Sequence, residues 1–525
     1  MMKHLILCAD GTGNLGGTTP DSNVYRTYHL IDRHDPSQPQ VVYYDNGVGT
    51  AANTYWRAFT GAFGFGFKRN VLELYEFLAR NYDPGDKVFL FGFSRGAAEV
   101  RALSGMIAAV GLVDGRTLDQ ETLKEKIAQA YSHYKHKTPG VLFQSHGAIE
   151  LTFIGVWDTV SALGFPQHWK VAGIASPIFN VLFWLLDRAC DMSFFAHRFY
   201  NYELTENVRH AYQALAIDEE RLSFEPKIWK EEKTQTTHVE QVWFAGAHSN
   251  VGGGYGRAGL SHITLEWMLL KAIPLGLKLK SGAVEEVHSK AHAHGRLYNE
   301  RNGLGVFYRY YPRLIADLCR ENISSSTPIN IHRSVFERME RFTGNYAPGY
   351  LPSTFDVVDE DTPSKTVTIQ NPQWVDLQNQ LRNWTIARSW LYGILLDVSL
   401  FIVAAALWLW TWPPSSLEPA SIGIAAIGST LQHLAAILTY FLPVLFDNLI
   451  NLAVVHQPLY LGGTILVALG LFTLRGWVRS NYRKVCDALR TIILSTPVLP
   501  GLSKRPNLAI EVTSKQGEKV PERSS

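Results

Sequence analysis

Two kinds of hydrophobic segment alternate along the first half of the chain. Short apolar runs, typical of strands buried on both faces, occupy His4–Ala9, Gln40–Tyr44, Lys87–Phe91, Glu150–Val156 and Glu240–Phe244. Apolar residues at helical spacing occupy Phe65–Tyr82, Ala97–Val110, Thr122–Tyr134 and Ser261–Ile273. Strands that alternate with helices predict an α/β fold, in which helices cover both faces of a mostly parallel sheet.

The strand expected at Lys87–Phe91 runs directly into a Gly-x-Ser-x-Gly turn, Gly92 to Gly96, which carries Ser94. A serine on a sharp turn between a strand and a helix projects its hydroxyl clear of the backbone, where a histidine can reach it. The motif is weak without that context, because an ordinary turn can have the same residues. Its position between a strand and a helix predicts that Ser94 is a nucleophile.

Polar residues follow two further expected strands, as Asp158 and His248. The carboxyl ends of parallel strands meet at one edge of a sheet, where ligands bind. We therefore expect His248 to take the proton of Ser94 and Asp158 to orient the imidazole, since a serine hydroxyl needs both. The alternatives are that Asp158 caps a helix and that His248 caps a loop.

Backbone amides near the serine could stabilise a developing oxyanion. The amide of Arg95 lies at the start of the expected helix, and the first strand ends in a turn that contains Gly11 and Thr12. These three residues form the predicted oxyanion hole. For the turn, a plain Asp-Gly reverse turn is the alternative.

The composition excludes several other kinds of chemistry. The net charge of +2 in 525 residues gives no reason to expect nucleic acid as a partner. The four cysteines stand far apart, which indicates neither a zinc site nor a disulfide framework. A histidine cluster at 288, 292 and 294 lacks the carboxylates of a metal site and is expected on a solvated helix. We predict no metal and no organic cofactor.

The C-terminal part contains 86 consecutive residues, 389–474, without lysine or arginine. Within it, Leu391–Trp412 and Asn448–Leu474 are each long enough to cross a bilayer. Basic residues flank the pair on both outer sides, so the positive-inside rule predicts a membrane hairpin with the catalytic domain and the C-terminal tail in the cytoplasm. The expected location is the bacterial inner membrane, with the bilayer as a partner.

The apolar segment Ser421–Phe446 complicates this topology. A third crossing would place the basic residues after Leu474 on the opposite side, so we interpret the segment as an interfacial or re-entrant helix. A buried helical hairpin in a soluble protein is the remaining alternative, although such hairpins need a charged outer face. A transport role would require more buried polar groups than the acidic residues Asp397 and Asp447 provide.

Five ordered motifs resemble the DUF2235 family of α/β-hydrolases, which includes the Tle1-type phospholipase effectors of bacterial type VI secretion. They are Asp-Gly-Thr-Gly-Asn at 10–14, Gly-Phe-Ser-Arg-Gly-Ala at 92–97, Gly-Val-Trp-Asp-Thr-Val at 155–160, Ala-Leu-Ala-Ile-Asp-Glu-Glu-Arg at 214–221 and Trp-Phe-Ala-Gly-Ala-His-Ser-Asn-Val-Gly-Gly-Gly-Tyr at 243–255. The resemblance covers about residues 3–355. In the last motif, Asn250 stands where the family usually has an aspartate.

This resemblance implies an α/β-hydrolase fold and a Ser94–Asp158–His248 triad that acts on lipid esters, of which phospholipid acyl esters are the first expectation. The expected domains are a catalytic domain at 1–355 with a cap at about 163–205, a connector at 356–388, the membrane hairpin at 389–478 and a basic polar tail at 479–525. The rival hypothesis is a catalytically inactive membrane receptor or scaffold. The oligomeric state, the head group and the acyl position stay open.

Overall fold

The computed structural model describes most of the catalytic domain and two long C-terminal helices. The described residues are 2–11, 14, 16–17, 20–47, 66–136, 149–160, 202–230, 237–302, 308, 310–320, 329–359, 363–411 and 458–496. Within the long helices, the side chains at 396, 397, 399–411 and 458–465 are not described. Most of the expected cap, together with Thr12, therefore lies outside the described residues.

A single nine-stranded sheet forms the centre of the fold, in the order β2-β1-β3-β4-β5-β6-β7-β8-β9. Its strands are β1 (His4–Ala9), β2 (Gln40–Asp45), β3 (Lys87–Phe93), β4 (Leu151–Trp157), β5 (Val208–Ala216), β6 (His238–Phe244), β7 (Ile329–His332), β8 (Thr354–Val358) and β9 (Lys365–Thr368). Neighbouring strands from β2 to β8 are parallel, and β9 pairs with β8 in the antiparallel sense. The predicted mostly parallel sheet is confirmed.

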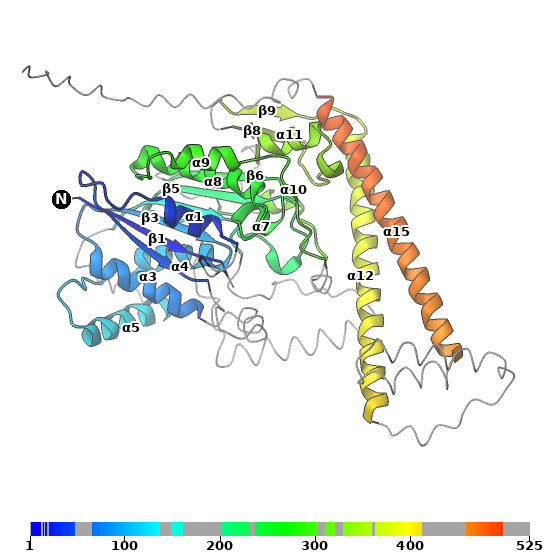
Figure 1. Cartoon of the computed structure of the whole chain (residues 1–525), viewed down its shortest axis with the longest axis horizontal. Coiled ribbons are helices and arrows are strands. Elements are labelled where there is room, and N and C mark those ends of the chain that lie inside the picture. The colour runs from blue at the N-terminus through cyan, green and yellow to red at the C-terminus, as the bar shows by residue number, and fades with distance from the viewer. Residues whose placement is uncertain are drawn as a thin grey trace, which may run out of the picture.

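Helices cover both faces of this sheet (Figure 1). One face carries α3 (Phe67–Asn81), α4 (Arg95–Val110) and α5 (Gln120–His136), and the other carries α1 (Asn23–Leu30), α8 (Gly259–Ala272) and α9 (Ala283–Lys290). Each face encloses its own apolar core. Because the central strands are buried on both sides, their sequences are continuous apolar runs rather than alternating patterns.

A third apolar cluster lies at the β7–β9 end of the sheet. It joins α10 (Ile315–Arg320), α11 (Arg333–Glu340) and the inner ends of α12 (Trp374–Thr411) and α15 (Pro458–Leu494). Shorter helices complete the chain, namely α7 (His248–Gly252), η1 (Leu222–Phe224), η3 (Ile273–Leu275) and η5 (Thr343–Asn345). Figure 1 shows α12 and α15 side by side, projecting from this end of the domain.

The C-terminal organisation differs from the expected division in two places. Strands β8 and β9 continue the sheet beyond residue 355, into the segment expected to be a connector. Residues 479–494, expected in a polar tail, instead form the end of α15, where Val485, Leu489 and Ile493 are buried in the third cluster. Their apolar residues recur at helical spacing among the basic ones, so one face packs while the other stays solvated.

No helix in the described part of the chain is both long enough and apolar enough to cross a bilayer. The predicted membrane hairpin is therefore not found among the described residues. Residues 412–457, which include the segment interpreted as an interfacial helix, lie outside them.

Candidate active site

Ser94 occupies a strained turn at the carboxyl end of β3. Its backbone angles are φ 58° and ψ −118°, a combination that residues other than glycine rarely adopt. The backbone N–H of Ser94 donates to the carbonyl of Trp157 at 3.0 Å, which fixes the turn to the end of β4. Helix α4 begins at the next residue, Arg95. This is the sharp strand-to-helix turn that the motif predicts.

The two flanking glycines are required because the backbone segments approach closely. A Cβ atom on Gly96 would lie 2.2 Å from the carbonyl oxygen of Ala9 in β1, and one on Gly92 would lie 2.6 Å from the Cα of Ala97. Both distances are far below van der Waals contact, and both obstacles are backbone atoms. Any side chain at these positions would therefore push α4 away from the sheet.

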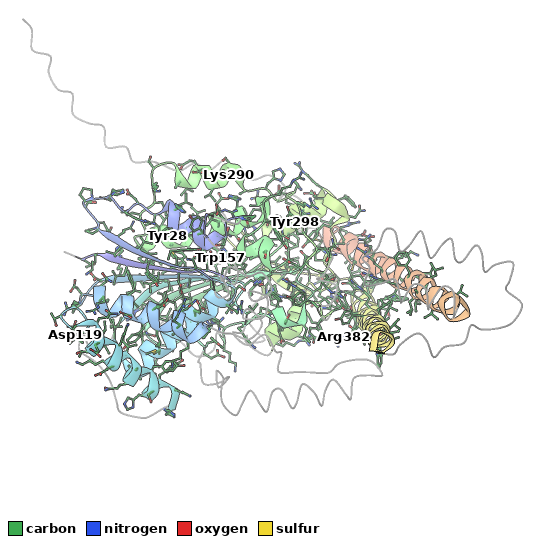
Figure 2. The ribbon with its side chains drawn as sticks, turned by 60° about the horizontal axis from the view of Figure 1, so that its bottom comes forward. Tyr28, Asp119, Trp157, Lys290, Tyr298 and Arg382 are labelled. Carbon is green, nitrogen blue, oxygen red and sulfur yellow. The ribbon has the colours of Figure 1, made fainter. Side chains whose placement is uncertain are left out.

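Asp158 and His248 meet beside this turn. Asp158 directly follows β4, and its Oδ2 lies 2.5 Å from Nδ1 of His248, which begins α7 after β6. Phe93, which precedes the serine, pairs in register with Trp157, which precedes the aspartate. Figure 2 places Trp157 in the interior of the molecule. The structure thus brings the predicted base and carboxylate together, at the same edge of the sheet as Ser94.

The imidazole of His248 is held between two aromatic rings. The ring of Phe93 lies 4.7 Å from it and that of Phe224 lies 4.9 Å from it, centroid to centroid. With Nδ1 on Asp158, the other ring nitrogen, Nε2, is buried and has no hydrogen-bond partner among the described residues. A nitrogen in this position can accept a proton.

Arg313 is a contact of Asp158 that the sequence did not reveal. Its Nη1 donates to Oδ1 of Asp158 at 2.5 Å, and its Nη2 donates to Oδ2 at 2.8 Å. Burial by itself would raise the pKa of Asp158, but the Arg313 guanidinium and the bond to His248 bring the pKa well below its usual range. The ionised carboxylate is therefore the favoured form of Asp158.

The backbone around His248 is fixed by side chains that the sequence did not assign. The amide N–H of His248 donates to Oε2 of Glu219 at 3.2 Å, and Glu219 forms a buried ion pair with Arg221. Asn250 accepts from the N–H of Tyr298 and donates to the carbonyl of Arg296, each at 3.1 Å. An aspartate at this position would lack the amide donor. The departure at Asn250 therefore serves the loop rather than the imidazole.

The predicted oxyanion donors have different surroundings. Arg95 opens α4 immediately after Ser94, as expected. The amide of Gly11, by contrast, donates to Oδ1 of Asp10 at 2.6 Å, so the geometry does not support its predicted role. Asp10 also accepts from Ser22 and Tyr44, and it thereby organises this loop. Thr12 lies outside the described residues.

Two more carboxyl groups are buried near the same edge. Asp45 ends β2 and Glu99 lies on α4, and each has one carboxylate oxygen without a hydrogen-bond partner in the described part of the chain. Burial raises the pKa of Asp45 to about 7 and holds that of Glu99 well above its usual value. Asn70 donates to the other oxygen of Glu99 at 3.2 Å. Neutral carboxyl groups are thus favoured here.

The substitution Asp45→Asn is expected to stabilise the protein at alkaline pH. Between the unfolded pKa of about 3.9 and the folded value of about 7, the unfolded chain loses a proton that the folded chain keeps, so stability falls as pH rises. Asparagine removes this effect, with a gain of up to roughly 4 kcal/mol in the free energy of unfolding at pH 8. Urea unfolding at pH 4.5 and pH 8 measures it; an equal effect at both values would contradict the prediction.

The histidine cluster has ordinary partners. His288 lies 2.5 Å from Glu266, and His294 lies 2.7 Å from the hydroxyl of Thr343. Within the described ranges, no group of three or more His, Cys, Asp or Glu side chains is arranged to hold a metal ion. Nothing in these ranges therefore assigns a metal role to the cluster.

The sequence of this chain matches a known protein family. The family described as T6SS, phospholipase effector Tle1-like, catalytic domain matches residues 3–271. This chain belongs to that family. The match begins before β1 and ends within α8, so Ser94, Asp158 and His248 lie inside it, whereas Arg313 lies beyond it.

More distant relatives add less. An uncharacterized protein of Saccharomyces cerevisiae, YEL023C, is 23% identical over 419 aligned residues, which cover 56% of this chain and 60% of that protein. The chain thus spans about 60% of the length of this relative. Two solved structures also match the Tle1-like chain at 18% identity. One is the Tle1 effector bound to the VgrG spike of the type 6 secretion system; the match has a TM-score of 0.28 and covers 49% of this chain and 52% of that chain. The other is an uncharacterized protein from Pseudomonas aeruginosa; the match has a TM-score of 0.37 and covers 88% of this chain and 66% of that chain.

Proposed function

We propose that this chain is a serine hydrolase that cleaves acyl esters of lipids, phospholipids first among them. Ser94 is the nucleophile, His248 the general base and Asp158 the group that orients the imidazole. The observation that supports this most directly is the 2.5 Å contact between His248 Nδ1 and Asp158 Oδ2, beside the strained turn of Ser94. The order Ser, Asp, His along the chain is that of α/β-hydrolases.

In the proposed mechanism, Nε2 of His248 takes the proton of Ser94 as Oγ attacks the ester carbonyl. The Asp158 carboxylate stabilises the imidazolium that forms and stays ionised throughout. The Arg95 amide supplies one oxyanion donor, and Thr12 stays a predicted second one. The imidazolium then protonates the leaving alcohol, and water releases the acyl group by the same steps.

The test is acyl release by the purified full-length protein. In detergent, it should hydrolyse p-nitrophenyl butyrate and release fatty acid from mixed phospholipid vesicles, and a fluorophosphonate should label Ser94. Product analysis by mass spectrometry also identifies the head group and the acyl position. A folded protein that shows neither labelling nor acyl release would favour the receptor or scaffold hypothesis instead.

We further propose that residues 389–478 attach the enzyme to a bilayer, with the catalytic domain on the cytoplasmic side of a bacterial inner membrane. Support comes from α15, where Leu466 and Phe472 are each 71% exposed and Trp477 is 59% exposed. Soluble monomers rarely expose such contiguous apolar surface. Arg475 and Arg479 follow, where they can meet anionic head groups.

Membrane fractionation tests this location. The full-length protein should sediment with membranes and resist alkaline carbonate extraction. The double substitution Leu466→Glu and Phe472→Glu should weaken this association, whereas the same changes at exposed Lys124 and Lys126 of α5 should not. A carbonate-soluble wild-type protein would overturn the proposed attachment but not the proposed chemistry.

A further inference from the structure

Arg313 comes from a segment with no assigned role. In the sequence it lies between Tyr310, which forms an isolated antiparallel β-bridge with Arg221, and helix α10. It also lies outside residues 3–271, which match the family. Its side chain is 3% exposed, and that of Asp158 is fully buried. Two of its N–H groups donate to Asp158, as described above. The same guanidinium donates to the carbonyl of Ala216 at 2.7 Å and to that of Phe224 at 2.6 Å.

These bonds leave the Asp158 carboxylate little freedom. Oδ1 accepts from the N–H of Ala216 at 3.0 Å and from Arg313, while Oδ2 accepts from His248 and Arg313. A bidentate guanidinium fixes the plane of a carboxylate as well as its position. The carbonyls of Ala216 at the end of β5 and of Phe224 in η1 in turn hold the guanidinium. These two elements therefore determine the orientation of Oδ2 toward His248.

The guanidinium also changes the charge that the imidazole experiences. Among the described residues, the ionisable groups around His248 are Asp158 at the end of β4, Glu219 after β5, its partner Arg221, and Arg313. With Glu219 paired to Arg221, Arg313 is the cation that offsets Asp158. A positive charge on the imidazole would gain less here than beside an unpaired aspartate.

We propose that Arg313 is a positioning residue for the Ser94–His248–Asp158 triad: it fixes the Asp158 carboxylate in the orientation that holds His248, and its positive charge offsets the negative charge of Asp158 beside the imidazole. This inference rests on the proposed function and deepens it. It assigns catalytic importance to a residue beyond the family match.

The test compares Arg313→Met, which removes both the charge and the forked donors, with Arg313→Lys, which keeps the charge. Two readouts are measured from pH 4 to pH 9: kcat/KM for p-nitrophenyl butyrate and the rate of fluorophosphonate labelling. For Arg313→Met, we expect both to fall about 10- to 100-fold at pH 8, and the acid limb of the profile to move up by about one pH unit. For Arg313→Lys, we expect a similar fall with the acid limb in its wild-type position.

A matched control separates this role from general support of the fold. Arg101 is also buried, and its guanidinium donates to the carbonyls of Tyr202 and Lys227 rather than to a carboxylate. Arg101→Met should lower the unfolding temperature and leave the acid limb unchanged. Thermal unfolding of each variant reports the fraction that is folded, and both rates are normalised to it.

The outcomes distinguish the two proposals. An inactive, unlabelled wild-type protein would refute the hydrolase itself. An active wild-type protein whose Arg313→Met variant has an unmoved acid limb would overturn the charge role. An Arg313→Lys variant with wild-type kcat/KM would overturn the positioning role. If Arg313→Met does not fold, Arg313→Gln, which removes the charge and keeps an amide donor, is measured in its place, and Arg313→Lys decides whether the fork matters.

Discussion

Replacing Ser94 with alanine is expected to lower kcat for ester hydrolysis by roughly 10⁴- to 10⁶-fold, because the proposed mechanism forms the acyl-enzyme on the Ser94 hydroxyl. The remaining rate should be that of binding and oxyanion stabilisation alone. Fluorophosphonate labelling should also disappear, because the substitution removes the hydroxyl that the reagent modifies. The measurement is p-nitrophenyl butyrate hydrolysis by the detergent-solubilised protein, with active-site titration of the wild type as the reference.

Ser94→Gly supplies a matched control that also tests the strain in the turn. At φ 58° and ψ −118°, glycine avoids a backbone cost of about 1–3 kcal/mol that serine and alanine both bear. Both variants should be inactive, but Ser94→Gly should unfold at a higher temperature than Ser94→Ala. Full activity in either variant would refute the nucleophile assignment, and equal stability would refute the strain.

Asp158→Asn is expected to have the second largest effect, on both activity and stability. The amide no longer holds the imidazole in the required tautomer, so kcat should fall by about 10⁴-fold. The substitution also leaves the Arg313 guanidinium buried without a counter-ion, which should cost about 3–5 kcal/mol in the free energy of unfolding. Steady-state kinetics and urea unfolding measure the two effects.

The double variant separates these two effects. Adding Arg313→Met to Asp158→Asn removes the unpaired charge, so most of the lost stability should return while activity stays low.

The pH dependence of stability gives a second check on the ion pair. Since the pKa of Asp158 is held below its unfolded value, its contribution is present above pH 4 and is lost as pH falls further. An Asp158→Asn variant as stable as the wild type at pH 7 would contradict the ion pair.

Local sequence was sufficient for the strands β1 to β4 and β6 and for the helices α3, α4, α5 and α8. β1 was predicted at its observed bounds, and the strand before Ser94 was predicted two residues short, because the glycine at 92 suggested an earlier end. Such buried parallel strands are recognisable because both of their faces are apolar. The strands β7, β8 and β9 at one end of the sheet were missed, since short strands in a polar stretch carry no comparable pattern. The middle strand β5 was also missed, because Arg209, His210 and Gln213 interrupt its apolar run.

The candidate site divides in the same way. Ser94 lies in a motif whose residues are adjacent in sequence, and Asp158 and His248 follow strands that the sequence predicts. Gly11 was assigned from its turn alone, and the contact of its amide with Asp10 is a detail of conformation that no spacing reveals. Glu219 lies in one of the family motifs, but its bond to His248 depends on how two loops meet.

By itself, the sequence determined the strands β1 to β4 and β6, the turn at Ser94 and the polar residues that follow β4 and β6. These depend on local apolar patterning and on glycine geometry, which short segments specify. The tertiary structure alone decided that Arg313 reaches Asp158, because the two residues are 155 positions apart and meet only when the chain has folded around both. No sequence pattern marks an arginine that will be buried. Its partner is the buried carboxylate that the folded chain places within reach of its guanidinium.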